Sequence, residues 1–337
     1  MKIKENISNS CPTIEQELLL RAIFKQGNEA IDAWNQWQAK VDVDKLDAGS
    51  YRLLSLLYYN LRTKKVDHPL MSKFKEIYSQ TWCQNQILFH HTRALLHAFH
   101  KAGIQKTLLL KGAALILFHY KDYGLRPMMD FDILIFPETA VNAIHLLKES
   151  HWTPKPSLET DINDLIGRQH AWEFQNDNGS KLNLHWHLFR ECLPKDADND
   201  FLVDAVSDTF DDVPVYALNP TDQLLHVCVL MAKGNTLLPL RWIADAMMIL
   251  QTSPKIDWER LLIQTEQRRL ILPLRNTLNY LHDRLDAPIP STILQRLQNL
   301  SVSMPESLEY QVTKTSVLLF QNHLWFKYQS PKPTHKY

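Results

Sequence analysis

The sequence has few cysteines and no net charge, and both features exclude certain classes of protein. Its four cysteines, Cys11, Cys83, Cys192 and Cys228, are scattered along 337 residues and form no CxxC pair. This spacing does not suit a disulfide framework, so we expect a reducing, cytoplasmic compartment. Lysine plus arginine and aspartate plus glutamate each number 37. The balanced charge indicates that no overall field attracts nucleic acid or an anionic membrane.

Long apolar runs are also missing. The N-terminal stretch MKIKENISNSCPTIEQ contains no apolar segment followed by a cleavage site, so we expect no signal peptide. The longest apolar stretch, LLHVCVLMA at 224–232, has about half the length of a membrane-spanning helix. We therefore expect no membrane insertion. With 45% hydrophobic and 22% charged residues, the composition is that of a globular protein with a core.

Helical periodicity dominates both ends of the chain. Apolar residues recur at three- and four-residue spacing from Ile14 to about Ile104, and again from Pro220 to about Phe326. We accordingly expect a helical N-terminal region at 1–103, an α/β core at 104–218, a helical C-terminal region at 219–326 and a flexible tail at 327–337. In the C-terminal region, TDQLLHVCVLMAKG is expected to begin at a Thr/Asp cap.

The central region carries short apolar runs that predict strands. KTLLLKG is expected to form a strand that ends in a turn at Gly112, AALILFHY a helix, and FDILIF a second strand. The runs 169–176 and 181–189 are joined by NDNGS, which predicts a hairpin because asparagine and glycine tolerate positive φ.

Two aspartates stand in the apolar stretch LRPMMDFDILIF at 125–136. Side chains two residues apart on a strand point to the same face, so Asp130 and Asp132 should lie together. A carboxylate that is buried without a partner costs several kcal/mol or becomes protonated. The pair therefore predicts either a half-site for Mg²⁺ shared with substrate phosphates or a solvated strand end. The preceding Lys-Gly turn and Arg126 favour the metal and phosphate interpretation.

The stretch GIQKTLLLKGAALILFHYKDYGLRPMMDFDILIF resembles the uncharacterised bacterial nucleotidyltransferase family of the DNA polymerase β-like superfamily. LHW at 184–186 and the C-terminal motifs PTDQLLH and RWIADA extend this resemblance over about residues 50–250. It implies an α+β fold, with a small mixed sheet flanked by mostly helical regions. It also implies a nucleotide-binding enzyme that uses a metal ion and a nucleoside triphosphate such as ATP, and that passes the nucleotidyl group to an acceptor.

The same resemblance implies roles for individual residues. Gly112 and its neighbours Lys111 and Ala113 would meet the triphosphate, while Asp130 and Asp132 would hold Mg²⁺, with Mn²⁺ as the alternative ion. The turn of the superfamily usually carries a Gly-Ser or Gly-Gly pair, which this chain replaces with Lys-Gly-Ala. Lys111 could replace the missing hydroxyl as a point charge, or it could be a surface lysine at a strand end.

Arg126 and Asn183 leave further alternatives open. Arg126 could clamp phosphate oxygens or form a structural ion pair with an acidic side chain. Asn183 stands where the superfamily usually has a third carboxylate, and an amide carries no negative charge and is no base. Glu173, His185 or His187 could supply that function, with His185 taking the acceptor proton near neutral pH. Alternatively, His185 and His187 could be ordinary strand residues, either exposed or packed in the core.

Other polar residues are more simply explained by structure. Trp242 is expected to anchor the core, and Arg241 with Asp245 is expected to form an i,i+4 pair on a helix surface. His90 and His91 have no acidic or cysteine partner at ligand spacing, so we expect them to be solvated or packed.

Three functions remain open from the sequence. The first is a magnesium-dependent nucleotidyltransferase, whose acceptor could be a small hydroxylated molecule, a tRNA end or a protein side chain. The second is a degenerate transferase that acts as a nucleotide-binding or protein-interaction module, which Asn183 motivates. The third is a phosphohydrolase with a mixed centre of Asp130, Asp132, His185 and His187. The neutral charge predicts no extended nucleic-acid track.

Overall fold

The chain folds as two compact units, each assembled from separate segments. The computed structural model describes residues 12–157, 161–189, 196–232 and 240–311. A sheet unit comprises residues 51–226 and 245–261, and a helical unit comprises the described residues up to 50, within 227–244 and from 262 onward. These boundaries differ from the expected divisions after residues 103 and 218. The last helix before the sheet packs on the sheet, and residues 219–226 and 245–261 also belong to the sheet unit. The tail expected at 327–337 lies outside the described residues.

The described part of the sheet unit contains a seven-stranded mixed sheet in the order β3-β4-β5-β2-β1-β7-β6. Its strands are β1 (Leu108–Leu110), β2 (Asp130–Leu134), β3 (Trp152–Lys155), β4 (Ala171–Asn176), β5 (Lys181–His185), β6 (Val206–Phe210) and β7 (Val213–Ala217). The pairs β1–β7 and β2–β5 are parallel, and the other neighbours are antiparallel. The mixed α+β fold is confirmed, and so are β1, β2 and the β4–β5 hairpin. The sheet is larger than expected because β3, β6 and β7 were not predicted.

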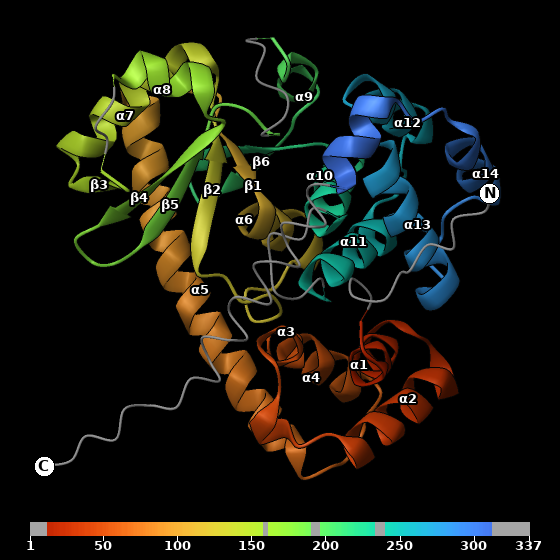
Figure 1. Ribbon diagram of the computed structural model, residues 1–337. Helices are drawn as coiled ribbons and strands as arrows, with labels where there is room; N and C mark the ends of the chain where they lie inside the picture. The colour runs from red at the N-terminus through yellow and green to blue at the C-terminus, as the bar shows by residue number, and fades with distance from the viewer. Residues whose placement is uncertain (1–11, 158–160, 190–195, 233–239, 312–337) are drawn as a thin grey trace, which may run out of the picture. The chain divides into compact units, whose positions relative to one another are not determined.

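Helices cover one face of this sheet. The helical segments of the sheet unit are α4 (Leu54–Thr63), α5 (Leu70–Lys101), α6 (Lys111–Leu115), the π-helical turn η2 (Ile116–Tyr120), η3 (Pro137–Thr139), α7 (Ala140–Glu149), α8 (Ile162–Arg168) and α9 (Asn199–Val203). The 32-residue α5, orange in Figure 1, contacts β2, β7 and α7. Phe131 and Ile133 of β2 are buried in the same core as Phe89 and Phe99 of α5. The aspartates of β2 therefore point to the face away from α5.

The helical unit is formed by segments from both ends of the chain. It contains α1 (Ile14–Phe24), α2 (Gly27–Lys40), η1 (Val43–Lys45), most of α3 (Ala48–Tyr51), α13 (Ile271–Leu285) and α14 (Ser291–Asn299). The boundary between the units passes through α10 (Pro220–Ala232), α11 (Leu240–Thr252) and α12 (Trp258–Gln267). The helices predicted at both ends are thus confirmed within the described residues. The cap of α10 is Asn219, whose Oδ1 accepts from the backbone N–H of Asp222 at 3.0 Å, and not the expected Thr/Asp pair.

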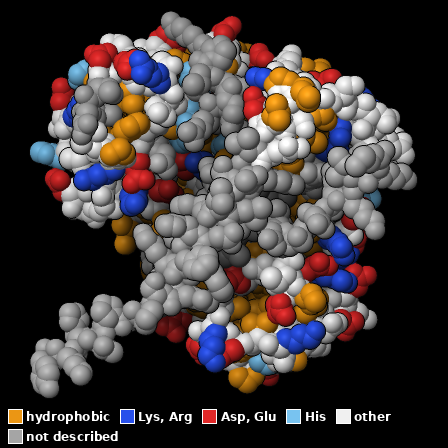
Figure 2. Space-filling model, in the orientation of Figure 1, with side chains coloured by type: hydrophobic (Ala, Val, Ile, Leu, Met, Phe, Trp, Pro, Cys, Tyr) orange, Lys and Arg blue, Asp and Glu red, His pale blue; other side chains and the backbone are white. Residues whose placement is uncertain are grey.

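The described surface shows no dominant sign of charge on the face in Figure 2, where lysine and arginine side chains lie among aspartate and glutamate side chains. This mixture agrees with the equal totals of 37 basic and 37 acidic residues. In the described segments, no helix combines the length and the apolar character that a membrane crossing needs.

The π-helical turn after α6 contains a histidine that should make stability depend on pH. Burial is the main cause that lowers the pKa of His119 from 6.5 to about 4, and its Nδ1 lies 2.9 Å from Oγ1 of Thr252. Between about pH 6.5 and pH 4 the unfolded chain binds a proton that the folded chain does not, so stability falls as the pH falls through this window. His119 should contribute up to about 3 kcal/mol to this loss.

We expect His119→Gln to flatten the dependence of the free energy of unfolding on pH between 4 and 6.5, measured by urea titration. His145→Gln, at an exposed histidine of α7, is the matched control and should keep the wild-type slope. An unchanged slope in His119→Gln would show that His119 is not the group responsible.

Candidate active site

The register of three strands brings the predicted site residues to one face of the sheet. Leu110, the last residue of β1, stands opposite Asp132 in the antiparallel pair with β2. On the other side of β2, Asp132 stands beside Asn183 of β5 in a parallel pair. Because alternate residues share a face, Asp130 and His185 lie on the same side as Asp132 and Asn183. Lys111 directly follows β1, so it enters at the same edge.

Asp132 is the centre of this arrangement. Its Oδ1 accepts from Nζ of Lys111 at 2.6 Å and lies 2.9 Å from Nε2 of His185. The side chain of Asp132 is only 4% exposed and that of His185 only 5%, whereas that of Lys111 is 22% exposed. The predicted cluster of Lys111, Asp132 and His185 is therefore assembled in space, and the carboxylate is buried with two partners.

The surroundings of Asp132 keep it ionised. Burial raises the pKa of Asp132, but the charge of Lys111 and the hydrogen bond from His185 outweigh burial and hold this pKa well below its usual value of 3.8. Burial also lowers the pKa of His185, in spite of the neighbouring Asp132. The imidazole is thus neutral at neutral pH and donates its Nε2 hydrogen to the carboxylate. The positive charge beside Asp132 comes from Lys111.

The contacts of His185 fit a hydrogen bond to Asp132 better than the role of a base that takes the proton of an acceptor hydroxyl. Its Nε2 is engaged with Asp132, and its Nδ1 is buried without a hydrogen-bond partner. Neither nitrogen is open to an acceptor hydroxyl in this conformation. His226 of α10 is also buried, and its pKa is lowered well below the usual value mainly by burial and next by the charge of Lys111. Both imidazoles are therefore uncharged at neutral pH.

Asn183 contacts the other aspartate of β2. Its Nδ2 donates to Oδ2 of Asp130 at 3.1 Å, and Asp130 is partly exposed. Glu173 of β4 stands opposite Asn183 in the register, and its carboxylate lies 3.4 Å from Nζ of Lys181. Glu173, one of the groups that could replace the third carboxylate, therefore already has a cationic partner.

Two carboxylates on one face can serve as part of a magnesium site. Carboxylate oxygens of Asp130 and Asp132 are hard ligands, and Mg²⁺ commonly takes its remaining ligands from water and substrate phosphates. The donor set thus fits the ion that the resemblance implies. Among the described residues, no three His, Cys, Asp or Glu side chains come together as a complete metal-binding group.

The turn after β1 differs from the expected phosphate loop. The residue with positive φ is Lys111, at 46°, while Gly112 and Ala113 are buried in α6. A Cβ at Gly112 would lie 2.5 Å from Nη1 of Arg126 and 2.6 Å from Sδ of Met128. A side chain at position 112 would thus displace the side chains of Arg126 and Met128. Lys111 is the part of this turn that remains partly exposed.

Arg126 forms a buried ion pair, which is the structural alternative of the two roles expected for it. Its Nε and Nη2 donate to Oδ1 and Oδ2 of Asp245 at 2.7 and 2.8 Å, and Tyr120 donates its hydroxyl hydrogen to Oδ1 at 2.9 Å. The side chains of Arg126 and Asp245 are 4% and 0% exposed. The expectation of a surface pair between Arg241 and Asp245 is therefore wrong, because Asp245 points inward. The guanidinium of Arg241 lies over the ring of Trp242, 4.5 Å from its centroid, and Trp242 is buried as expected.

Two other histidines considered in the sequence, His187 and His91, have partners other than the two aspartates. Nδ1 of His187 lies 2.9 Å from Oδ2 of Asp198, which also accepts from the backbone N–H of Leu188. His187 is thus held by an acidic residue of the following loop. A phosphohydrolase centre would need His187 beside Asp130, Asp132 and His185, and His187 is bound to Asp198 instead. Nδ1 of His91 lies 2.7 Å from Oγ of Ser180, which agrees with a packed side chain.

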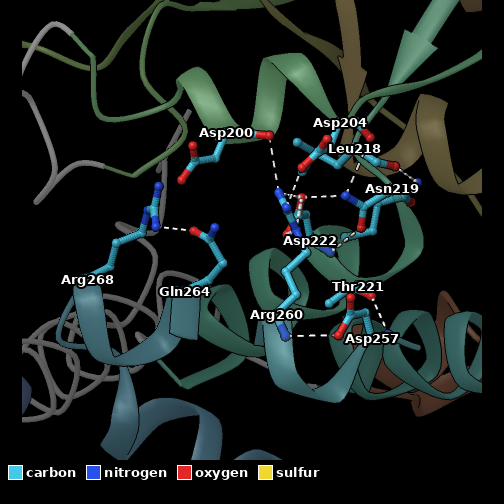
Figure 3. A network of polar contacts seen from close by, with 11 residues as sticks. Asp200, Asp204, Leu218, Asn219, Thr221, Asp222, Asp257, Arg260, Gln264 and Arg268 are labelled. Atoms are coloured by element: carbon cyan, nitrogen blue, oxygen red, sulfur yellow. Dashed lines mark hydrogen bonds and ion pairs between the residues drawn. The ribbon is translucent and has the colours of Figure 1, made fainter. Parts of the chain in front are cut away.

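A second polar network fixes the segment that follows the sheet (Figure 3). Nη2 of Arg260 donates to Asp222 at 2.8 Å and to the backbone carbonyl of Asp200 at 3.1 Å, and Nη1 contacts Asp204. Asn219 donates to Oδ2 of Asp222 at 2.6 Å. Burial raises the pKa of Asp222 in spite of these contacts. The network ties α9 and the start of α12 to the start of α10.

Three carboxylates of the sheet unit have structural partners that the sequence did not identify: Asp198, Asp222 and Asp245. The sequence did carry a signal for two of them, because Asp222 lies in PTDQLLH and Asp245 in RWIADA. Their partners could not be identified, because Arg126 is 119 residues from Asp245 and Arg260 is 38 residues from Asp222.

A search of curated proteins finds no match. A solved structure described as an antigenic nucleotidyltransferase-like protein from Paracoccidioides brasiliensis is 16% identical, with a TM-score of 0.37, and the match covers 66% of this chain and 97% of that one. The family model of an uncharacterised nucleotidyltransferase matches residues 48–286, which is more than half of the 337 residues. The chain therefore belongs to this family of uncharacterised nucleotidyltransferases.

Proposed function

We propose that the protein is a metal-dependent nucleotidyltransferase that passes a nucleoside monophosphate from a nucleoside triphosphate to a hydroxyl acceptor. The observation that carries this proposal is the buried, ionised Asp132 beside Asp130, on the strand that follows the Lys-Gly turn. A buried carboxylate with a strongly shifted pKa is more typical of a functional site than of a solvated strand end. The wider assignment to the DNA polymerase β-like superfamily stays a prediction.

Each residue of the site has a role in this proposal. Asp130 and Asp132 hold Mg²⁺ or Mn²⁺, which would neutralise charge on the triphosphate and on the leaving pyrophosphate. Lys111 contacts a phosphate oxygen as a point charge. His185 and Asn183 orient the two carboxylates through the contacts at 2.9 and 3.1 Å. In the reaction, the bond from the α-phosphorus to pyrophosphate breaks, a bond to the acceptor oxygen forms, and the acceptor proton goes to solvent or to a base.

Label transfer tests this function directly. The purified protein is incubated with each α-labelled triphosphate, Mg²⁺ or Mn²⁺, and a fractionated cell extract. Label should move to an acceptor in the small-molecule, RNA or protein fraction and identify its class. Calorimetry with each triphosphate and metal should show binding that depends on both. Absence of both binding and transfer with all four nucleotides would rule the proposal out.

A second candidate is a nucleotide-binding protein that has lost the transfer step. Asn183 favours it, because the amide donates a hydrogen to Asp130 where a third carboxylate would have added charge for a metal ion. This candidate predicts binding of a triphosphate without label transfer to any fraction. A transferred label excludes it.

Asn183→Asp should separate the two candidates. The added carboxylate lies next to Asp130, so we expect the affinity for Mn²⁺ in the presence of triphosphate to rise about tenfold, measured by calorimetry. Label transfer should rise as well if the wild type is a weakened enzyme. Asn163→Asp, at an exposed position of α8, is the control for the added charge and should change neither quantity. A variant that folds but gains no metal affinity would contradict the placement of the metal beside Asp130.

A further inference from the structure

The ammonium group of Lys111 contacts one of the two carboxylates that would hold a metal ion. Nζ lies 2.6 Å from Oδ1 of Asp132, and Nε2 of His185 meets the same oxygen at 2.9 Å. With a side chain that is 4% exposed, Asp132 has little solvent to balance its charge. The lysine therefore supplies the charge balance that a divalent ion would otherwise supply.

The backbone fixes where this ammonium group can reach. Lys111 adopts a left-handed conformation with φ of 46°, which is uncommon for a residue other than glycine. The residue before it, Leu110, is paired with Asp132 in the sheet, and the residue after it, Gly112, is packed so closely that a Cβ would lie 2.5 Å from Arg126. The Cα of Lys111 is thus held on both sides, and its side chain is aimed at the carboxylate.

The side chain of Lys111 can nevertheless reach solvent. It is 22% exposed, whereas the carboxylate it contacts is nearly buried. A lysine stem is flexible and its ammonium group is a point charge that can exchange one anionic partner for another. A triphosphate that bound at this turn would offer such a partner, because it carries several negative oxygens.

We propose that Lys111 is a tethered counter-ion, which occupies the metal position at Asp132 in the nucleotide-free protein and leaves it when a triphosphate arrives. The inference deepens the metal-dependent transfer proposed above and rests on it. A divalent cation beside Asp132 would be repelled by an ammonium group at hydrogen-bond distance from the same oxygen. Metal and nucleotide should consequently bind together, because the phosphates draw Lys111 away from the carboxylate.

The test measures Mn²⁺ binding to the nucleotide-free full chain by calorimetry. We expect weak binding by the wild type and at least a tenfold gain in affinity in Lys111→Met, which removes the charge and keeps the length of the side chain. Lys111→Arg keeps the charge and should bind as weakly as the wild type. The matched control is Lys121→Met, since Lys121 also has a positive φ, of 55°, and pairs with Asp208 at 3.7 Å with 62% of its side chain exposed. Lys121→Met should bind Mn²⁺ like the wild type.

Two further variants make the result decisive. Adding Asp132→Asn to Lys111→Met should remove the gain, because the gain comes from this carboxylate. If Lys111→Met fails to fold by circular dichroism, Lys111→Gln takes its place in both measurements. The inference is overturned if the neutral variant binds Mn²⁺ no more tightly than the wild type, or if the gain persists without Asp132.

The same data separate this inference from the proposed function. A gain of Mn²⁺ affinity in a protein that neither binds nor turns over triphosphates would leave Lys111 as a counter-ion and end the transferase proposal. Label transfer by the wild type without any gain in Lys111→Met would end the counter-ion inference and leave the transferase.

Discussion

Asp245→Asn should lower the free energy of unfolding by about 3 to 5 kcal/mol, because it leaves the guanidinium of Arg126 buried without a negative partner. Both carboxylate oxygens accept from Arg126, and Oδ1 also accepts from Tyr120, so one substitution disturbs the whole network. Neither charged side chain can turn to water, since they are 4% and 0% exposed. Urea titration measures the loss, and an unchanged m-value would show that the unfolded state is not altered.

The pair between Arg168 and Asp164 on α8 provides a control of the same chemistry. These side chains meet at 2.9 Å but are 76% and 42% exposed, so Asp164→Asn should cost less than about 1 kcal/mol. A combined Arg126→Met and Asp245→Asn variant should recover part of the loss, because no unpaired charge is then buried. A loss below 1 kcal/mol in Asp245→Asn alone would mean that Arg126 finds another partner, which would reopen a role in phosphate binding.

Local pattern in the sequence predicted the parts of the fold that local physics determines. The two-residue period of a strand placed Asp130 and Asp132 on one face, and NDNGS marked the hairpin that joins β4 and β5. The hairpin of β6 and β7 escaped detection. Its turn is formed by Asp211 and Asp212, with φ of 52° at Asp211, and Pro214 stands inside β7. Both features weaken a strand prediction, because Asp-Asp is a poor turn signal and proline removes a donor.

Contacts between side chains that are far apart in the sequence could not be predicted from it. Lys111 was predicted as a phosphate contact or a surface lysine, yet it meets Asp132, because the antiparallel register of β1 and β2 places them together. The choice for Arg126 between phosphate and an acidic partner depended on α11, whose Asp245 comes 119 residues later. A pattern of residue types gives the charges available in a site, and the register and packing decide which of them meet.

The largest effect on activity is expected from Asp132→Asn. The substitution removes the charge that binds a metal ion and that Lys111 now balances, while the shape of the side chain is kept. Label transfer from an α-labelled triphosphate should fall at least about 100-fold, which is the order of loss for a group that stabilises charge in a transition state. The fold should survive, because Lys111, with 22% of its side chain exposed, can extend into solvent once its partner is neutral.

Asp208→Asn is the matched control for Asp132→Asn, since Asp208 lies on the edge strand β6 of the same sheet and is exposed. It should retain wild-type transfer and stability. Metal binding in the presence of triphosphate should disappear in Asp132→Asn and persist in Asp208→Asn, which distinguishes a lost ligand from a damaged fold. If Asp132→Asn folded and transferred label at the wild-type rate, the buried carboxylate would be a structural partner of Lys111 and His185, and the chemistry would have to lie elsewhere in the chain.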